Sequence, residues 1–196
     1  MPAGQFSTWI AEIRAALRGE RDAEVACGEC TACCTGSQFI HVGPDETDTL
    51  SHIPRELLFP APGRPAGHVL MGYDEQGHCP MLVDDVCTIY EHRPRTCRTY
   101  DCRVFPAAGV EPEDELIAAR ARRWQFEFPT ETDTQLRAAV RAAVAYTVER
   151  HVELGDDAPA SPGEFAVMAV ELHDLFLRGE PEVSEVRVEL ARRRPD

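Results

Sequence analysis

All eight cysteines of this 196-residue chain lie in one segment, between residues 27 and 102. They are Cys27, Cys30, Cys33, Cys34, Cys79, Cys87, Cys97 and Cys102. A segment that holds so many thiols is constrained by what the sulfurs bind, which is either one another or a metal. The remainder of the chain can fold by burying apolar side chains alone.

The spacing of the first four cysteines favours metal. A Cys-x-x-Cys step brings two sulfurs within reach of one ion, at about 2.3 Å each. Cys27, Cys30 and Cys33 make two such steps, a spacing typical of zinc knuckles and iron–sulfur sites. Cys34 projects away from its neighbour Cys33, so the two cannot easily occupy corners of one tetrahedral site. We therefore expect more than one metal atom, either in two centres or in one cluster.

A disulfide framework is the alternative for an even cysteine count. A bridge between Cys33 and Cys34 has poor geometry, because neighbouring Cα atoms lie about 3.8 Å apart and disulfides prefer about 5.5–6 Å. The first residues, Met-Pro-Ala-Gly-Gln-Phe-Ser, lack the basic region of a secretory signal. We therefore expect a cytoplasmic protein whose thiols stay reduced and free to bind metal.

Charge and composition exclude several functions. The formal net charge of −14 argues against a nucleic-acid binder, and no apolar run approaches the roughly 20 residues that cross a membrane. We therefore expect the protein to bind neither nucleic acid nor a membrane, and we leave open whether it binds another protein. All 20 basic residues are arginine, which excludes lysine Schiff-base chemistry.

The pattern of apolar residues predicts an α+β fold in two parts. Residues 1–110 are expected to form a metal-stabilised cysteine-rich domain with an N-terminal helix over 7–20 and short β-hairpins. Residues 111–196 are expected to form a mainly helical extension that packs on it. The predicted strands are 37–42, 68–73 and 78–83, with a hairpin turn at 74–77 and another at 84–85. The predicted later helices are 113–127, 132–154 and 161–178.

Basic and aromatic residues surround the later cysteines. Arg93 and Arg98 are candidates to lower thiol pKa values or to donate hydrogen bonds to sulfur, whereas Arg95 and Arg103 fit ordinary surface pairing better. His78 and His92 are candidates for hydrogen bonds beside the metal rather than ligands, since eight cysteines already suffice. Tyr90 is expected to pack beside the centre.

An ordered set of motifs over about residues 24–105 resembles the CxxCxxCC family, the YkgJ-like cysteine-cluster proteins. The first cysteine run is followed by Cys79-Pro-Met-Leu82 and by Cys87-x-Ile-Tyr90-x-x-Arg93-Pro94-x-x-Cys97-Arg98. The resemblance implies a zinc- or iron-chelating domain. Some relatives are flagellin lysine methylases that carry the same cysteine cluster.

The sequence therefore predicts a metal-binding protein in which the eight cysteines hold an iron–sulfur cluster or a zinc centre, with a redox or electron-transfer role. One alternative is an interaction module with purely structural zinc. Another, implied only by the resemblance, is a modification methylase. Whether the chain is an enzyme stays open.

Overall fold

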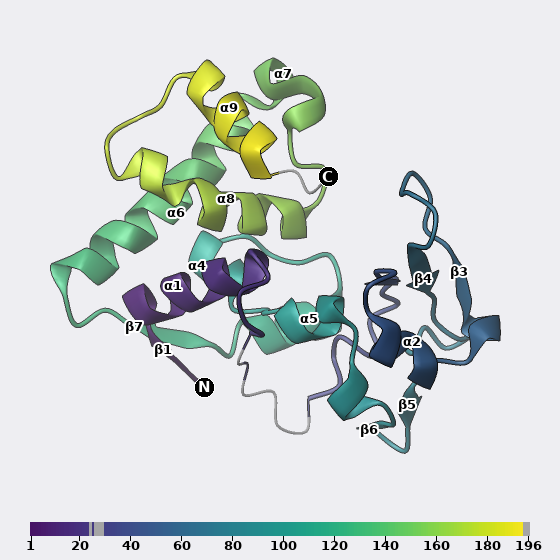
Figure 1. Cartoon of the computed structure of the whole chain (residues 1–196). Coiled ribbons are helices and arrows are strands. Elements are labelled where there is room, and N and C mark those ends of the chain that lie inside the picture. The colour runs from purple at the N-terminus through teal and green to yellow at the C-terminus, as the bar shows by residue number, and fades with distance from the viewer. Residues whose placement is uncertain (24, 26–29, 194–196) are drawn as a thin grey trace. The chain divides into compact units, whose positions relative to one another are not determined.

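The chain divides into two compact units (Figure 1). One unit combines residues 1–14 with 102–196, and the other is the continuous stretch 15–101. The computed structural model describes residues 1–23, 25 and 30–193. Helices and a few short strands in small sheets make up the described chain, so the predicted α+β class is confirmed. None of the described helices is long and apolar enough to cross a membrane.

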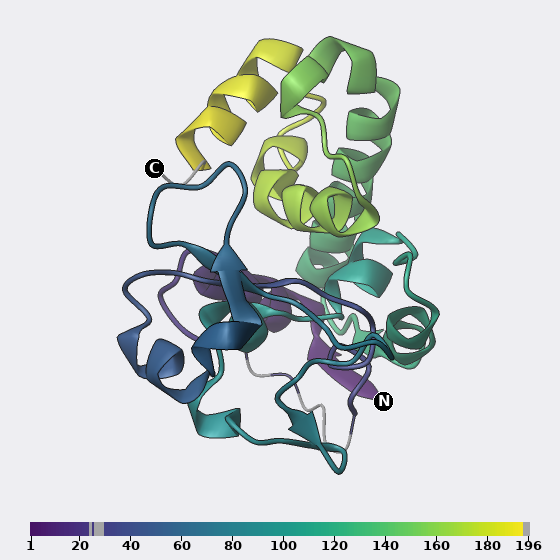
Figure 2. The ribbon, with the colours of Figure 1, turned by 90° about the vertical axis from the view of Figure 1, so that its right-hand side faces the viewer.

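The discontinuous unit is mainly helical and carries one small sheet. Its elements are β1 (Pro2–Gln5), α1 (Phe6–Leu17, whose last turn belongs to the other unit), α4 (Val104–Ala108), α5 (Glu115–Ala121), β7 (Gln125–Glu127), α6 (Glu131–Glu149), α7 (His151–Leu154), the 3₁₀ helix η3 (Gly155–Asp157), α8 (Pro162–Phe176) and α9 (Val183–Arg193). Helix α6 packs along α8, and α4 contacts both (Figure 1). Figure 2 shows α9, in yellow, alongside the other C-terminal helices.

Aromatic side chains tie the first residues of the chain to this helical unit. Strand β1 pairs in parallel with β7, and the buried rings of Phe6 and Trp9 lie 5.1 and 4.8 Å from the ring of Phe126. At the start of α1, the N–H of Ser7 donates to the buried carboxylate of Asp133 in α6 over 2.8 Å. Helix α1 begins at Phe6, one residue before the predicted start at residue 7. The carboxylate of Asp133, rather than a residue of α1 itself, accepts the N–H of Ser7.

This packing differs from the domain boundary predicted near residue 110, which grouped the N-terminal helix with the cysteines. The first fourteen residues pack with the C-terminal helices because β1 and Phe6 meet β7 and Phe126. Compact packing does not test which segments fold independently, so the domain assignment stays a prediction.

Two predicted helices have different ends from those expected. The helix expected over 113–127 ends at Ala121, and the chain continues as β7. The helix expected over 132–154 is divided into α6 and α7 near Arg150. Ser161 caps the start of α8, since its hydroxyl accepts the N–H of Glu164.

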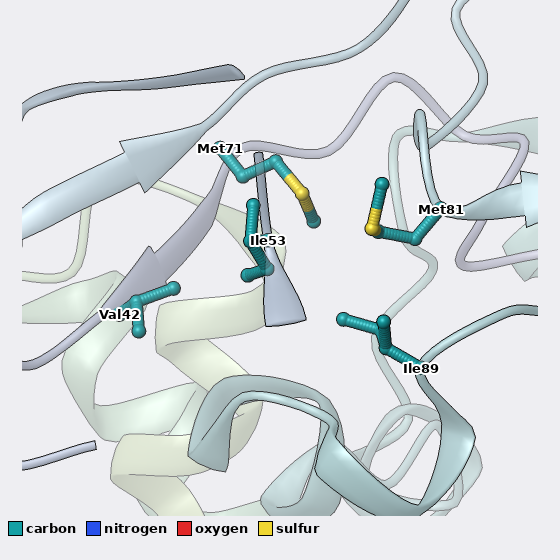
Figure 3. Close-up of a cluster of buried hydrophobic side chains, with 5 residues drawn as sticks. All are labelled: Val42, Ile53, Met71, Met81 and Ile89. Carbon is teal, nitrogen blue, oxygen red and sulfur yellow. The ribbon is translucent and has the colours of Figure 1, made fainter. Parts of the chain in front are cut away.

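The continuous unit contains the cysteine segment and is built from short elements. They are β2 (Ile40–Val42), α2 (Thr47–His52), the 3₁₀ helix η1 (Arg55–Leu57), β3 (Leu58–Pro60), β4 (Val69–Met71), β5 (Leu82–Val83), β6 (Val86–Cys87), the 3₁₀ helix η2 (Tyr90–His92) and α3 (Arg95–Thr99). Strand β4 lies between β2 and β3, and both pairings are antiparallel. A small apolar core lies against them, made of Val42, Ile53, Met71, Met81 and Ile89 (Figure 3).

The predicted hairpin between residues 68–73 and 78–83 is wrong. The turn at Asp74–Gly77 is present, but β4 finds its partners in β2 and β3 instead. The second predicted turn does form a hairpin, because β5 and β6 pair around Asp84 and Asp85. Both aspartates have positive φ angles, of 50° and 60°, as a two-residue turn of this kind requires.

Candidate metal centre

Cys79 is held by backbone contacts on both sides. Its N–H donates to the carbonyl of Cys34 over 2.6 Å, which joins the first cysteine run to the second group. The backbone N–H groups of Met81 and Leu82 donate hydrogen bonds to the Cys79 thiol. Burial raises the pKa of Cys79, and these two donors act in the opposite direction. Donors of this kind favour the thiolate, which is the form that binds metal.

Cys87 reaches the same region from the hairpin that follows. The hairpin pairs Leu82 with Cys87, and the side chains of Cys79 and Cys87 pack against the apolar core of the unit. The two thiols interact electrostatically, which adds to the raised pKa of Cys79. Six residues of the chain, 82–87, thus form a tight hairpin that returns the second sulfur toward the first.

Cys97 brings the third segment of the motif into this group. It lies in α3, where its N–H donates to the carbonyl of Pro94 over 2.9 Å. Burial, together with the neighbouring thiols of Cys79, Cys34 and Cys87, raises its pKa to about 12. Four cysteines far apart in sequence therefore share one electrostatic environment.

The first cysteine run is described from Cys30 onward, and Cys27 lies outside the described residues. Cys33 and Cys34 lie in a tight turn in which the N–H groups of Cys34 and Thr35 donate to the carbonyl of Thr31 over 2.8 and 3.0 Å. Cys30, Cys33 and Cys34 are each partly buried. In the part of the chain that the structure describes, every cysteine is a free thiol.

Cys102 belongs to the helical unit, as does its hydrogen-bond donor. The indole N–H of Trp124 donates to its sulfur over 3.1 Å, and both side chains are buried. Its predicted role as a metal ligand stays a prediction.

Arg93 is the arginine whose charge acts on the pKa of Cys97. Its charge lowers the pKa of Cys97, against the burial that raises it. Its Nε donates to the carbonyl of Tyr90 over 2.7 Å, and its guanidinium lies 3.6 Å from the centre of the Tyr90 ring. Tyr90 is 56% exposed and therefore packs on Arg93 at the surface.

Arg98 connects α3 to the segment that leads into the first cysteine run. Its Nη1 lies 3.2 and 3.4 Å from the carboxylate oxygens of Asp22, and its backbone carbonyl accepts the N–H of Ala23 over 2.8 Å. Its Nε donates to the carbonyl of Arg93 over 3.0 Å. These contacts of the Arg98 guanidinium are with oxygen atoms rather than with sulfur.

Arg95 and Glu46 are an anchor that the sequence pattern did not reveal. The buried carboxylate of Glu46 accepts the backbone N–H of Arg95 over 2.5 Å and that of Gly43 over 2.7 Å. The Arg95 side chain pairs with Asp45 at 2.6 Å. Glu46 was visible in the sequence only as an acid near the start of a helix, and its real partner is the start of α3, distant in sequence.

The role of His78 and His92 in hydrogen bonds beside the metal stays a prediction, and the structure gives the following contacts for them. The backbone N–H of His78 donates to Asp74 over 2.8 Å. The ring of His92 contacts Asp48 and stacks on His52. Asp48, His52 and His92 are also the group of three potential ligands whose donor atoms come within 4.8 Å of one another among the described residues.

Comparison with known proteins finds one family match. Residues 26–123, half of the chain, match the model of the family CxxCxxCC, described as "Putative zinc- or iron-chelating domain". No curated protein and no solved structure matches the chain.

Proposed function

The chain belongs to the CxxCxxCC family of zinc- or iron-chelating domains, and from this premise we propose that its cysteines bind an iron–sulfur cluster or zinc. Metal binding is the property of the family, and the ligand set and the metal are the proposal. Cys34, Cys79, Cys87 and Cys97 would hold the metal. Cys27, Cys30 and Cys33 would supply further sulfurs to a cluster with more than one metal atom.

The observation that carries this proposal is that the chain brings Cys34, Cys79, Cys87 and Cys97 into one region, where the other three thiols and burial raise the pKa of Cys97 to about 12. Buried thiols that repel one another in the charged state stay protonated at neutral pH. A bound cation removes that repulsion, and the thiols that ligate it release their protons and become thiolates. This cluster of thiols is therefore suited to binding a metal.

The surroundings of the sulfurs favour a redox role if the metal is iron. An iron–sulfur cluster supplies one-electron chemistry, and its potential depends on hydrogen bonds to sulfur, on nearby charge and on solvent exposure. The N–H groups of Met81 and Leu82 supply the hydrogen bonds, and Arg93 supplies the charge. Each of them stabilises the more negative, reduced state.

A structural zinc site is the second candidate, and the apolar core favours it. Cys79 and Cys87 pack directly against Val42, Ile53, Met71, Met81 and Ile89. A metal held by these thiols would join the hairpin and α3 to the core, as in a closed four-sulfur site. Such a site stabilises the unit without an open coordination position.

Purification without oxygen followed by elemental analysis and absorption spectroscopy tests the proposal. Iron and sulfide with visible absorption that bleaches under dithionite support the redox role, and colourless protein with stoichiometric zinc supports the structural one. Cys97→Ala should lose metal in either case. Val86→Ala, in the same hairpin as Cys87 but 65% exposed, is the matched control and should keep it. Folded wild-type protein that binds neither metal would contradict both candidates.

A further inference from the structure

Three potential ligands outside the cysteine motif meet on the surface of the cysteine unit. Asp48 and His52 lie four residues apart in α2, and residues at this spacing project from the same face of a helix. His92 comes from η2, which is distant in sequence. The ligand atoms of all three side chains lie within 4.8 Å of one another.

One carboxylate faces both imidazole rings. The Nδ1 atom of His92 lies 2.8 Å from one Asp48 oxygen, and the Nδ1 atom of His52 lies 3.8 Å from the other. The two rings stack with their centroids 3.6 Å apart and their planes 7° from parallel. The Asp48 side chain is 70% exposed, so water can reach the space between the three groups.

The charge of these groups suits a divalent cation. The hydrogen bond from His92 lowers the pKa of Asp48, so its carboxylate is charged at neutral pH. A divalent ion can bind one nitrogen of each ring and one carboxylate oxygen at once, a donor set that suits zinc and similar metals.

The backbones that carry the three side chains are fixed, whereas the rings themselves are at the surface. Ile53 follows α2 and Ile89 precedes η2, and both lie in the apolar core (Figure 3). The hydroxyl of Thr49 donates to the carbonyl of Arg93 over 3.5 Å, a second contact between the two segments. A metal lies in the plane of each ring that ligates it, so the parallel rings must turn apart. Rotation about the bond to the ring is soft for histidine.

We propose that Asp48, His52 and His92 form a second metal site, separate from the cysteine centre, which binds a divalent transition-metal ion such as zinc. Water fills its remaining positions. The bound ion joins α2 to η2, the segment between Cys87 and Cys97. The site therefore connects a surface helix of the unit to the chain segment that carries Cys87 and Cys97.

Calorimetric titration with Zn²⁺ tests this site in the full chain, after the cysteine centre has been filled. We expect one further equivalent of zinc to bind. His92→Gln and His52→Gln should each weaken that equivalent at least about tenfold. Asp48→Asn, which keeps the shape of the side chain, should weaken it in the same way. His151→Gln, in the helical unit, is the control and should bind as the wild type does.

Elemental analysis of the cysteine-bound metal in each variant separates this site from the cysteine centre. That metal should stay constant in all four variants, and circular dichroism should show that each is folded. A wild-type protein without a further equivalent would overturn the proposal. So would equal zinc affinity in wild type, His52→Gln and His92→Gln.

Discussion

The backbone N–H of Cys79 donates to the carbonyl of Cys34 over 2.6 Å. This bond connects the two halves of the cysteine motif through the main chain, so their relative position does not depend on the sulfurs alone. It also fixes the direction in which the chain leaves Cys79 toward Met81 and Leu82, whose N–H groups donate to the Cys79 thiol. Backbone contacts and a candidate metal ligand are thus combined at this residue.

We expect removal of the metal to loosen the cysteine unit more than the helical unit. The apolar core of the cysteine unit is small, so metal binding should supply much of its folding free energy. After chelation, hydrogen exchange should become faster at the amide of Cys79 and in β5 and β6. The amides of α6 and α8 should keep their protection, because these helices pack on each other and on α4. Equal protection with and without metal would contradict this expectation.

Arg98→Lys should reduce metal affinity, by about tenfold. Lysine keeps the charge but loses the donors that bind Asp22 and the carbonyl of Arg93 together, so the segment entering the first cysteine run is released. Metal content after dialysis against a competing chelator measures the effect.

Arg95→Lys is the matched control for this change. Its contact with Glu46 comes from the backbone N–H and survives the substitution, and lysine can still pair with Asp45. Its metal content should equal that of the wild type. If the two variants lost the same amount of metal, Arg98 would have no special role.

Ile53→Ala should destabilise the cysteine unit by about 2–5 kcal/mol, since truncating a buried aliphatic side chain leaves a cavity. Denaturant unfolding of the metal-loaded protein, followed by circular dichroism and by release of the metal, measures this loss. Val83→Ala, in the exposed half of the β5–β6 hairpin, should change stability by less than about 0.5 kcal/mol. A similar loss in both variants would mean that the small core contributes little.

Asp133 should make the stability of the helical unit depend on pH. Burial opposes the charge on Asp133, but hydrogen bonds from Thr130 and Ser7 outweigh it, and the pKa of the carboxyl falls well below its ordinary value of 3.8. A lowered pKa gives stability that is present above the ordinary value and is lost as pH falls below it. Thermal unfolding should therefore show a midpoint that decreases below about pH 4.

Asp133→Asn should lower this midpoint at neutral pH and flatten its decrease in acid. Glu131 lies in the same first turn of α6 as Asp133 but is exposed. Glu131→Gln is therefore a suitable control and should leave the acid response unchanged. An acid response that persists in Asp133→Asn would assign it to other carboxylates.

Much of the fold was predictable because it depends on local signals. Pro162 and Ser161 begin α8, and Ile53 ends α2 before Pro54. The pair Asp84 and Asp85 predicts the turn of the β5–β6 hairpin. In each case, the residues that decide the structure lie within a few positions of one another.

The strand pairings were not predictable in the same way. The chain segment of β4 has the same apolar pattern whether it pairs with the strand after it or with β2 and β3. The choice depends on which pairing buries Met71 beside Val42. The pairing of β1 with β7 likewise depends on contacts between Phe6 and Phe126, which lie at great distance along the chain.

The candidate site shows the same limit. The spacing of the motif identified the cysteines as candidate metal ligands and suggested that Arg93 lowers the pKa of a thiol. The charge of Arg93 does lower the pKa of Cys97. Spacing could not reveal that Arg98 pairs with Asp22, or that His92 contacts Asp48 and His52. Asp48 and His52 are at i and i+4 in a helix, which was the one available signal, but their third partner is supplied by the tertiary fold.

The parallel pairing of β1 with β7 has a consequence for the order of events during translation. The whole cysteine segment emerges from the ribosome before residues 125–127, which β1 needs as its partner. The cysteine unit can therefore begin to fold while the first fourteen residues of the chain still lack their final contacts.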